Sequence, residues 1–346
     1  MINVVVPGKL FIIGEYSILK PGNEAVLMAV DKFVNVYIKE ASNYSFTSEL
    51  GNFKWMNSDD IPVFSYNDLN HVKSAIYVSH LYLKYKNIPV KTYEIKLSSE
   101  LMTESFTKYG LGSSGAVIVG VIRAILGLHS EIVSKKRLFK LSVLAQIEIN
   151  DLSSGADLAT SIYGGYIKYR RYDLTWVMNH KGKLAELVNL DWPLLEITRL
   201  KKPEIMFSVS YSGITKKSKD SIENFSNYQD EKWYGLFINK ANLITKQFIE
   251  AFIRNDYFSM KQMIELFREN LLDLESKSNL KIESEPFKKM IETANSLGFA
   301  AKTSGSGYGD CGIALIRNND EKRTLEDKWR KNNLEVLNIK VWDYYE

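Results

Sequence analysis

Apolar and polar positions along the chain predict that strands and helices alternate. Short apolar or alternating runs predict strands over residues 2–6, 25–38, 93–97, 166–170, 205–211, 313–316 and 336–342. Helical spacing, or a long apolar run after glycine, predicts helices over residues 71–86, 116–126, 135–150, 155–163, 236–253, 258–274 and 286–297. Pro7-Gly8 is expected to end the first strand, and residues 43–70 indicate strand and loop.

The length and the order of these elements predict two lobes. A chain of 346 residues exceeds what one hydrophobic core usually serves. The character changes after Pro203, where one strand, a polar loop and three helices follow. We therefore expect an N-terminal lobe over residues 1–200 and a C-terminal lobe over residues 201–346.

Composition and charge favour a globular enzyme that acts on small anions. Hydrophobic residues make up 45% of the chain and charged residues 25%, as in ordinary soluble enzymes. The formal net charge of +4 is too small to mark a nucleic-acid-binding protein. A mild excess of basic residues suits an anionic substrate.

Several other classes of protein are disfavoured by what the chain lacks. The single cysteine, Cys311, excludes an intramolecular disulfide framework and fits a reducing compartment. Four scattered histidines without ligand spacing argue against zinc. No signal peptide is recognisable at the N-terminus, and the longest apolar stretch, Ala116–Leu128, is too short to span a bilayer. We expect a cytoplasmic protein with no membrane or nucleic-acid partner.

A glycine-rich loop is the first candidate for chemistry. Gly110–Gly115 satisfies the pattern G-x-G-x-x-G, but so does Gly307–Gly312, which shows how weak the pattern is alone. A dinucleotide-binding fold needs a strand directly before the glycines, and here a polar segment intervenes. Neither protein-kinase motifs nor the P-loop pattern occurs. Glycines followed by a helix favour an anion site at the helix N-terminus; the structural alternative is a turn capped by serine.

Four further segments give this loop a context. In chain order, with the loop included, they are Pro7–Lys9, Gly14–Tyr16, Gly110–Ala116, Ser154–Asp157 and Lys302–Gly312. Taken alone, the lysine in the first segment is typical of a solvated side chain, and the aspartate in the fourth is typical of a helix N-cap. Together, in this order, the segments resemble the motifs of the GHMP superfamily of small-molecule kinases.

The resemblance implies an α+β protein with the two-lobed GHMP kinase fold. Its N-terminal lobe would be a ribosomal-S5-like α/β unit, its C-terminal lobe a ferredoxin-like α+β unit, and the active site would lie between them. The cofactors implied are ATP and Mg²⁺. ATP would be bound by Lys108, Tyr109, Gly110, Leu111, Gly112, Ser113, Ser114 and Gly115.

The resemblance also assigns the catalytic and metal-binding residues. Lys9 and Asp157 would be catalytic and face the transferred phosphoryl group, and Ser114 would bind Mg²⁺. Whether Asp157 removes a proton or orients Lys9 stays open, because a phosphate acceptor is largely ionised at neutral pH. Three positions depart from the family: Tyr308 replaces a usual glycine, Gly115 a commoner alanine, and Gln146 the glutamate that mevalonate kinases use as a second magnesium ligand.

Within the superfamily, the Gly14–Tyr16 and Lys302–Gly312 segments resemble the phosphomevalonate kinases of Gram-positive type. The implied acceptor is therefore a small phosphorylated acid. Its expected contacts are Lys9, Tyr16, Ser17, Ser212, Gly213, Lys216, Ser218, Ser304 and Gly305, although a run of lysines such as that around Lys216 is usually just solvated. The alternatives are mevalonate kinase or another GHMP kinase, and a nucleotide-binding protein without catalysis, which should have lost Lys9 or Asp157. The oligomeric state stays open.

Overall fold

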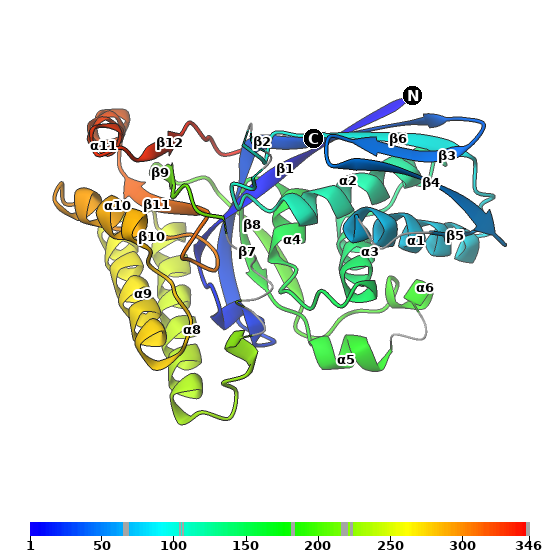
Figure 1. The fold of residues 1–346 in the computed structure, drawn as a ribbon. Helices are drawn as coiled ribbons and strands as arrows, with labels where there is room; N and C mark the ends of the chain where they lie inside the picture. Colours follow the sequence, from blue (N-terminus) through cyan, green and yellow to red (C-terminus); the bar gives the residue numbers. More distant parts are fainter. Residues whose placement is uncertain are drawn as a thin grey trace.

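The computed structural model describes residues 1–64, 69–103, 105, 107–180, 184–215, 221 and 224–343. Two sheets with their own helices form two lobes (Figure 1). The first sheet contains β1 (Ile2–Ile13), β2 (Glu24–Glu40), β3 (Tyr44–Ser48), β4 (Gly51–Ser58), β5 (Ile61–Val63), β6 (Tyr93–Ser99), β7 (Tyr166–Arg170) and β8 (Glu196–Leu200). The second contains β9 (Met206–Tyr211), β10 (Ala301–Thr303), β11 (Cys311–Ile316) and β12 (Glu335–Leu337). The α+β class and the two lobes are as expected.

The N-terminal lobe is a sheet with its main helices beneath it. The strand order is β5-β4-β3-β6-β2-β7-β8, and β1 pairs with β2 along the opposite edge of that long strand. Four helices lie on one side of this sheet (Figure 1): α1 (Asn70–Tyr85), α2 (Ser113–Leu128), α3 (Lys135–Glu148) and α4 (Ala156–Tyr163). α2 and α4 pack on β1 and β2, and α3 packs on the other three helices. The short elements η1 (Ser17–Leu19), α5 (Leu174–Asn179) and α6 (Leu184–Leu187) lie outside this layer. Twelve of the 16 residues of α2 are buried, because this helix packs on β1, β2, α1 and α3.

The expectation that Pro7-Gly8 ends the first strand is wrong. β1 continues to Ile13, and its register with β2 shifts between Pro7 and Gly8. A bulge lets a strand accommodate a proline, which has no N–H to donate. As a result Lys9 lies within a strand rather than in a flexible loop.

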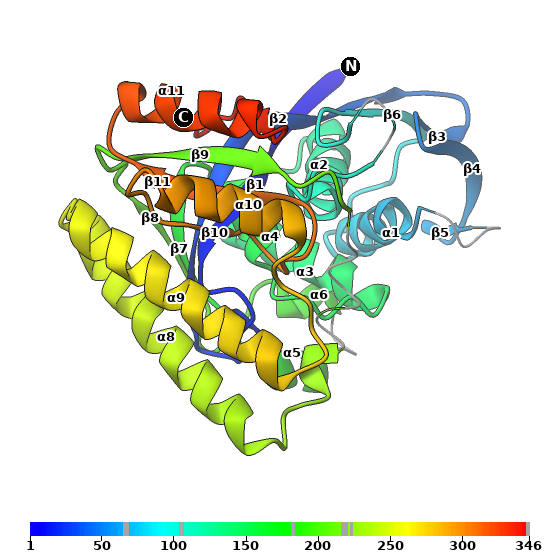
Figure 2. The same cartoon turned by 60° about the vertical axis from the view of Figure 1, so that its left-hand side comes forward.

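The C-terminal lobe has helices on both faces of a small sheet of order β10-β11-β9-β12. Its helices are α8 (Lys232–Ile253), α9 (Tyr257–Lys277), α10 (Glu285–Asn295) and α11 (Asn319–Lys331). Ala314 and Ile316 of β11 pack in one cluster with α10 and α11, whereas Ile313 and Leu315 belong to the main core, which includes α8 and α9. In Figure 2 α11 lies above β9, and α8 and α9 lie side by side below it. Apolar residues at every position of β11 are explained by this burial on two faces.

A segment late in the chain returns to the first sheet. β6 pairs with Val34–Glu40 and β7 with Glu24–Met28, which leaves the middle of one β2 edge open. Residues 340–342 occupy it: Trp342 N–H donates to Ala29 O at 2.9 Å, and Asp31 N–H donates to Lys340 O at 3.0 Å. In place of the continuous strand expected over 336–342, the structure has β12 and then an isolated bridge between Val341 and Val30.

The strands change from one sheet to the other between Leu200 and Met206. The division of the chain into two domains near residue 200 stays a prediction.

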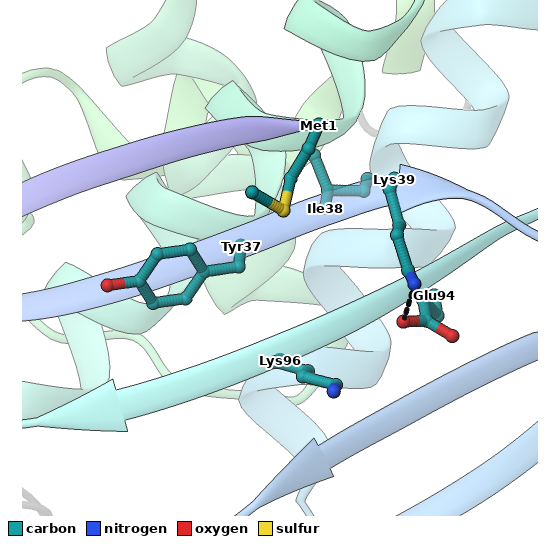
Figure 3. A pocket seen from close by; sticks show the side chains of 6 residues that line it. All are labelled: Met1, Tyr37, Ile38, Lys39, Glu94 and Lys96. Atoms are coloured by element: carbon teal, nitrogen blue, oxygen red, sulfur yellow. Dashed lines mark ion pairs between the residues drawn. The ribbon is translucent and has the colours of Figure 1, made fainter.

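The outer face of the first sheet carries a hollow lined by residues of β2 and β6 and by Met1. Figure 3 shows this hollow, of about 90 Å³, where Lys39 pairs with Glu94 at 3.0 Å beside Tyr37 and Lys96. No catalytic candidate lines it. Among the helices that the structure describes, none is both long and apolar enough to cross a membrane.

Candidate active site

The glycine loop and the start of α2 form an anion-binding backbone. Gly110 and Gly112 have φ angles of 80° and 79°, in the left-handed region that favours glycine. Gly112 is the N-cap of α2, and no side chain from the described residues caps this end. The alternative of a serine cap is therefore wrong, because Ser113 and Ser114 are the first two helical residues. The first N–H groups of the helix and its positive dipole end are suited to phosphate.

Two side chains from outside the loop pack directly on its glycines. A Cβ atom added to Gly110 would lie 2.2 Å from Asp310 Cβ, and one added to Gly112 would lie 2.8 Å from Lys9 Cγ. Lys9 also donates from Nζ to Gly110 O at 3.0 Å, and from its backbone N–H to Leu111 O at 2.8 Å. The strand β1 thus holds an ammonium group against the loop, and the solvated-lysine alternative does not describe Lys9.

Asp157 approaches the same helix end from α4. The N-cap of α4 is Gly155, so Asp157 lies in the first turn and is not the cap. A Cβ atom at Gly115 would lie 2.4 Å from Asp157 Oδ2, which explains why this chain has glycine where alanine is commoner. Burial and the neighbouring Asp151 carboxylate raise the pKa of Asp157, while Lys9 opposes this rise. Lys9 and Asp157 therefore converge on the N-terminus of α2.

The segment before the glycines is anchored by the C-terminal lobe. The Cys311 thiol is buried and donates to Tyr109 O at 3.1 Å, and the Tyr109 ring packs edge-on against Tyr211 at a centroid distance of 5.1 Å. Lys108 is exposed, and its Nζ lies 3.4 Å from Ser114 Oγ. The expected burial of the Cys311 thiol is confirmed, although Cys311 is the first residue of β11 rather than a residue before the strand. The loop is thus held from both lobes.

The N-terminal motifs (residues 7–9 and 14–16) and the Lys302–Gly312 motif contact each other across the lobes. Lys302 Nζ lies 2.5 Å from Glu15 Oε1, and both side chains are buried. Tyr16 OH donates to Ser306 O at 2.6 Å, and Ser304 Oγ donates to Phe11 O at 2.8 Å. No local sequence pattern predicts the Glu15–Lys302 pair, because the two residues lie 287 positions apart.

Apart from Lys9, which packs on the glycine loop, the residues expected to bind the acceptor fall into three groups. Tyr16, Ser17, Ser304 and Gly305 lie at this contact between motifs, where Ser17 Oγ donates to Gly14 O at 3.1 Å and Gly305 N–H donates to Glu15 at 3.4 Å. Ser212 and Gly213 instead line a cavity of about 540 Å³ between the end of β9, α10 and residues 332–335. Lys216 and Ser218 lie outside the described residues.

A magnesium ion fits this site only with few protein ligands. No cluster of three or more His, Cys, Asp or Glu side chains suited to a metal occurs in the described part of the chain. Gln146 is buried on α3, and its side-chain oxygen has no hydrogen-bond partner among the described groups. The oxygen atoms at the helix end include the Ser114 hydroxyl and the Asp157 carboxylate. Such a set suits Mg²⁺, which usually takes one or two protein ligands together with phosphate and water.

Comparison with known proteins gives consistent matches over the whole chain. The family model of the GHMP kinases N terminal domain matches residues 70–165, and that of GHMP kinases C terminal matches residues 248–335. A phosphomevalonate kinase from Streptomyces sp. strain CL190 is 30% identical over 90% of this chain and 88% of its own length. A mevalonate kinase from Methanocaldococcus jannaschii is 22% identical over 97% of this chain and 98% of its own.

Two solved structures have nearly the same fold. A Streptococcus pneumoniae phosphomevalonate kinase, in complex with phosphomevalonate and AMPPNP, superposes with a TM-score of 0.89 at 25% identity and covers 99% of this chain and 100% of its own. A protein from Listeria innocua superposes with a TM-score of 0.94 at 29% identity, over 99% of this chain and 98% of its own.

Proposed function

Since this chain belongs to the GHMP kinase family, we propose that it transfers the terminal phosphoryl group of ATP to the phosphate of (R)-5-phosphomevalonate. The products are 5-diphosphomevalonate and ADP, a step of the mevalonate pathway of isoprenoid biosynthesis. The observation that carries this assignment is the 30% identity, over 90% of the chain, with the Streptomyces phosphomevalonate kinase. The likeness to the S. pneumoniae enzyme that binds phosphomevalonate and AMPPNP supports the same acceptor and donor.

The glycine loop would hold the donor. Backbone N–H groups of Gly112–Gly115 and the positive end of the α2 dipole would face the phosphates, and the exposed ammonium of Lys108 adds a positive charge beside Ser114. Ser114 would bind Mg²⁺, with Asp157 close by. When bound, the ion would neutralise negative charge on the phosphates.

Lys9 and Asp157 would act on the transfer itself. The bond between the terminal phosphorus and the bridging oxygen of ADP breaks, and a bond to an oxygen of the acceptor phosphate forms. Charge neutralisation at fixed positions is the main contribution a protein makes to such a step, and Lys9 is fixed by β1 and by Gly110 O. The acceptor oxygen is largely ionised at neutral pH, since its second pKa is near ~6. Asp157 would therefore orient Lys9 more than it removes a proton.

The acceptor would lie where the N-terminal motifs (residues 7–9 and 14–16) contact the Lys302–Gly312 motif. Tyr16, Ser17, Ser304 and Gly305 meet there, and Lys9 lies on the same strand as Phe11, whose carbonyl accepts from Ser304. Ser212 and Gly213 line a separate cavity, so they are weaker candidates for direct contact with the acceptor.

Phosphomevalonate is expected to be the preferred acceptor in a coupled ADP-release assay with Mg²⁺. The panel should include mevalonate, homoserine and galactose, since GHMP kinases as a family act on small hydroxylated molecules as well. Mevalonate kinases are among the relatives of this chain. Equal or better turnover of mevalonate would show that the proposed acceptor is wrong, while the assignment to the GHMP kinase family would stand.

Ser114→Ala is expected to raise the Mg²⁺ concentration that gives half-maximal activity by about 10- to 100-fold, the scale seen when groups at a metal site are lost. Thermal unfolding should change little, because Ser114 does not cap α2. Ser134→Ala is the matched control, since Ser134 does cap α3 by accepting from Arg137 N–H. The control variant should lose thermal stability and keep the magnesium dependence of the wild type. If Ser114→Ala instead lost stability and kept its magnesium dependence, Ser114 would not be a magnesium ligand.

A further inference from the structure

Arg171 is a buried cation that neither the motifs nor the mechanism above uses. It follows β7 and is only 3% exposed. Its guanidinium donates to three backbone carbonyls, those of Leu19, Leu152 and Ser153, at 2.9 Å for Leu152 and 3.3 Å for Ser153. Its Nε is buried without an acceptor, and no carboxylate among the described residues forms an ion pair with it. A buried charge of this kind needs a reason, because burial without a counter-ion is unfavourable.

The three carbonyls belong to two loops, which we call the acceptor loop (residues 14–23) and the aspartate loop (residues 151–155). The acceptor loop contains Ser17, and it is further tied to Arg171 by its backbone, since Arg171 N–H donates to Asn23 O at 3.1 Å and Gly22 N–H donates to Arg171 O at 2.9 Å. Asn23 Nδ2 in turn donates to Ser17 O at 2.9 Å. One side chain therefore fixes the spacing between the loop expected to hold the acceptor and the loop that leads to Asp157.

The charge of Arg171 is not cancelled inside the aspartate loop. Asp151 is the carboxylate of that loop, but its oxygens are engaged elsewhere: Oδ1 accepts from Ser153 N–H at 3.1 Å and Oδ2 lies 3.7 Å from His71 Nε2. Carbonyl dipoles stabilise the guanidinium and leave its net charge in place. Coulomb attraction in a partly buried site acts over several ångströms, so a positive charge at this position would attract an anion bound within that range.

We propose that Arg171 is a positioning and specificity residue for the acceptor. It holds the acceptor loop and the aspartate loop at the separation that phosphoryl transfer needs, and its uncompensated charge favours an acceptor with two anionic groups over one with a carboxylate alone. This inference rests on the proposed function, which supplies the doubly anionic acceptor. The fork of N–H donors that reaches two loops at once is specific to arginine.

The test is steady-state kinetics of Arg171→Gln and Arg171→Lys with phosphomevalonate, mevalonate and ATP varied in turn. Arg171→Gln should lower kcat/KM for phosphomevalonate by roughly 10²-fold, the scale of a small misplacement in an active site, and leave the KM for ATP unchanged. The ratio of kcat/KM for phosphomevalonate to that for mevalonate should fall. Arg171→Lys should recover much of this ratio, because it keeps the charge, but not the full turnover.

Arg170→Gln is the matched control, because Arg170 is the preceding residue, is half exposed and pairs with Glu196 at 2.8 Å. It should behave as the wild type. Equal losses for Arg170→Gln and Arg171→Gln, or losses for ATP as large as those for the acceptor, would overturn the inference. Should Arg171→Gln not fold, a folded Arg171→Lys with wild-type kcat/KM for phosphomevalonate would overturn it as well. Failure of the wild type to use phosphomevalonate would instead refute the proposed function.

Discussion

Asp157→Asn is expected to lower turnover about 10²- to 10³-fold, the scale for loss of one preorganised group that stabilises charge in the transition state. Asparagine keeps the size and one oxygen but loses the negative charge that balances Lys9. Both groups lie at the start of α2, so removing one charge disturbs the other. The measurement is kcat with saturating substrates across pH. An Asp157→Asn activity that recovers as pH rises through ~6, the second pKa of the acceptor phosphate, would indicate orientation rather than proton removal.

The stability of the same variant separates this role from a structural one. Burial and Asp151 raise the pKa of Asp157 in the folded protein. A carboxyl group with a raised folded pKa binds more protons in the folded state, so stability falls as pH rises above the unfolded value near ~3.9. Asp157→Asn removes this penalty and should unfold at the wild-type temperature or above at neutral pH, with the difference shrinking in acid. A lower unfolding temperature together with normal turnover would show that Asp157 is only structural.

Lys302→Met is expected to destabilise the protein by about 3–5 kcal/mol, because it leaves the buried carboxylate of Glu15 without its partner. The pair is fully enclosed, since the side chains are 0% and 2% exposed, and burial lowers the pKa of Lys302. The pair joins the end of β1 to β10, so the loss should appear in the unfolding of both lobes. Urea or thermal unfolding measures it.

Two controls sharpen that measurement. Lys39→Met breaks the exposed Lys39–Glu94 pair and should cost at most about 1 kcal/mol. The double variant Glu15→Gln with Lys302→Met removes both charges and should recover part of the lost stability. A single Lys302→Met variant as stable as Lys39→Met would mean that the pair adds nothing to the contact between the lobes.

Local patterns predicted most of the fold, and the failures have identifiable causes. β7 was expected over Tyr166–Arg170 and has those bounds. The hydrophobic pattern does not predict helix α11, because only Leu325 and Trp329 of this polar helix are buried. The N-cap residue Asn318, followed by two acidic residues in the first turn, is the sequence signal that indicates the start of this helix. The early end assigned to β1 came from reading Pro7-Gly8 as a turn, whereas a bulge absorbs both residues.

The site was predictable where one segment carries it and less so where two segments meet. Glycine spacing located the loop, and motif order drew attention to Lys9 and Asp157. No local pattern shows that Gly115 makes room for Asp157 or that Glu15 meets Lys302, because these contacts join residues far apart in the sequence. Arg171 belongs to no motif, and only the three carbonyls around it reveal its position.

The first sheet can be completed only after residues 340–342 have been synthesised, near the end of translation. β2 emerges early, but Lys340, whose N–H donates to Asp31 Oδ1, follows 309 positions later. At roughly 5–20 residues per second, the nascent chain would expose the open β2 edge for roughly 15–60 s. An unpaired edge invites pairing with another chain. Once β6 and β7 have paired with β2, the open part of its edge is limited to the few residues between them. A neighbouring nascent chain on the same messenger RNA could then form few hydrogen bonds with this edge.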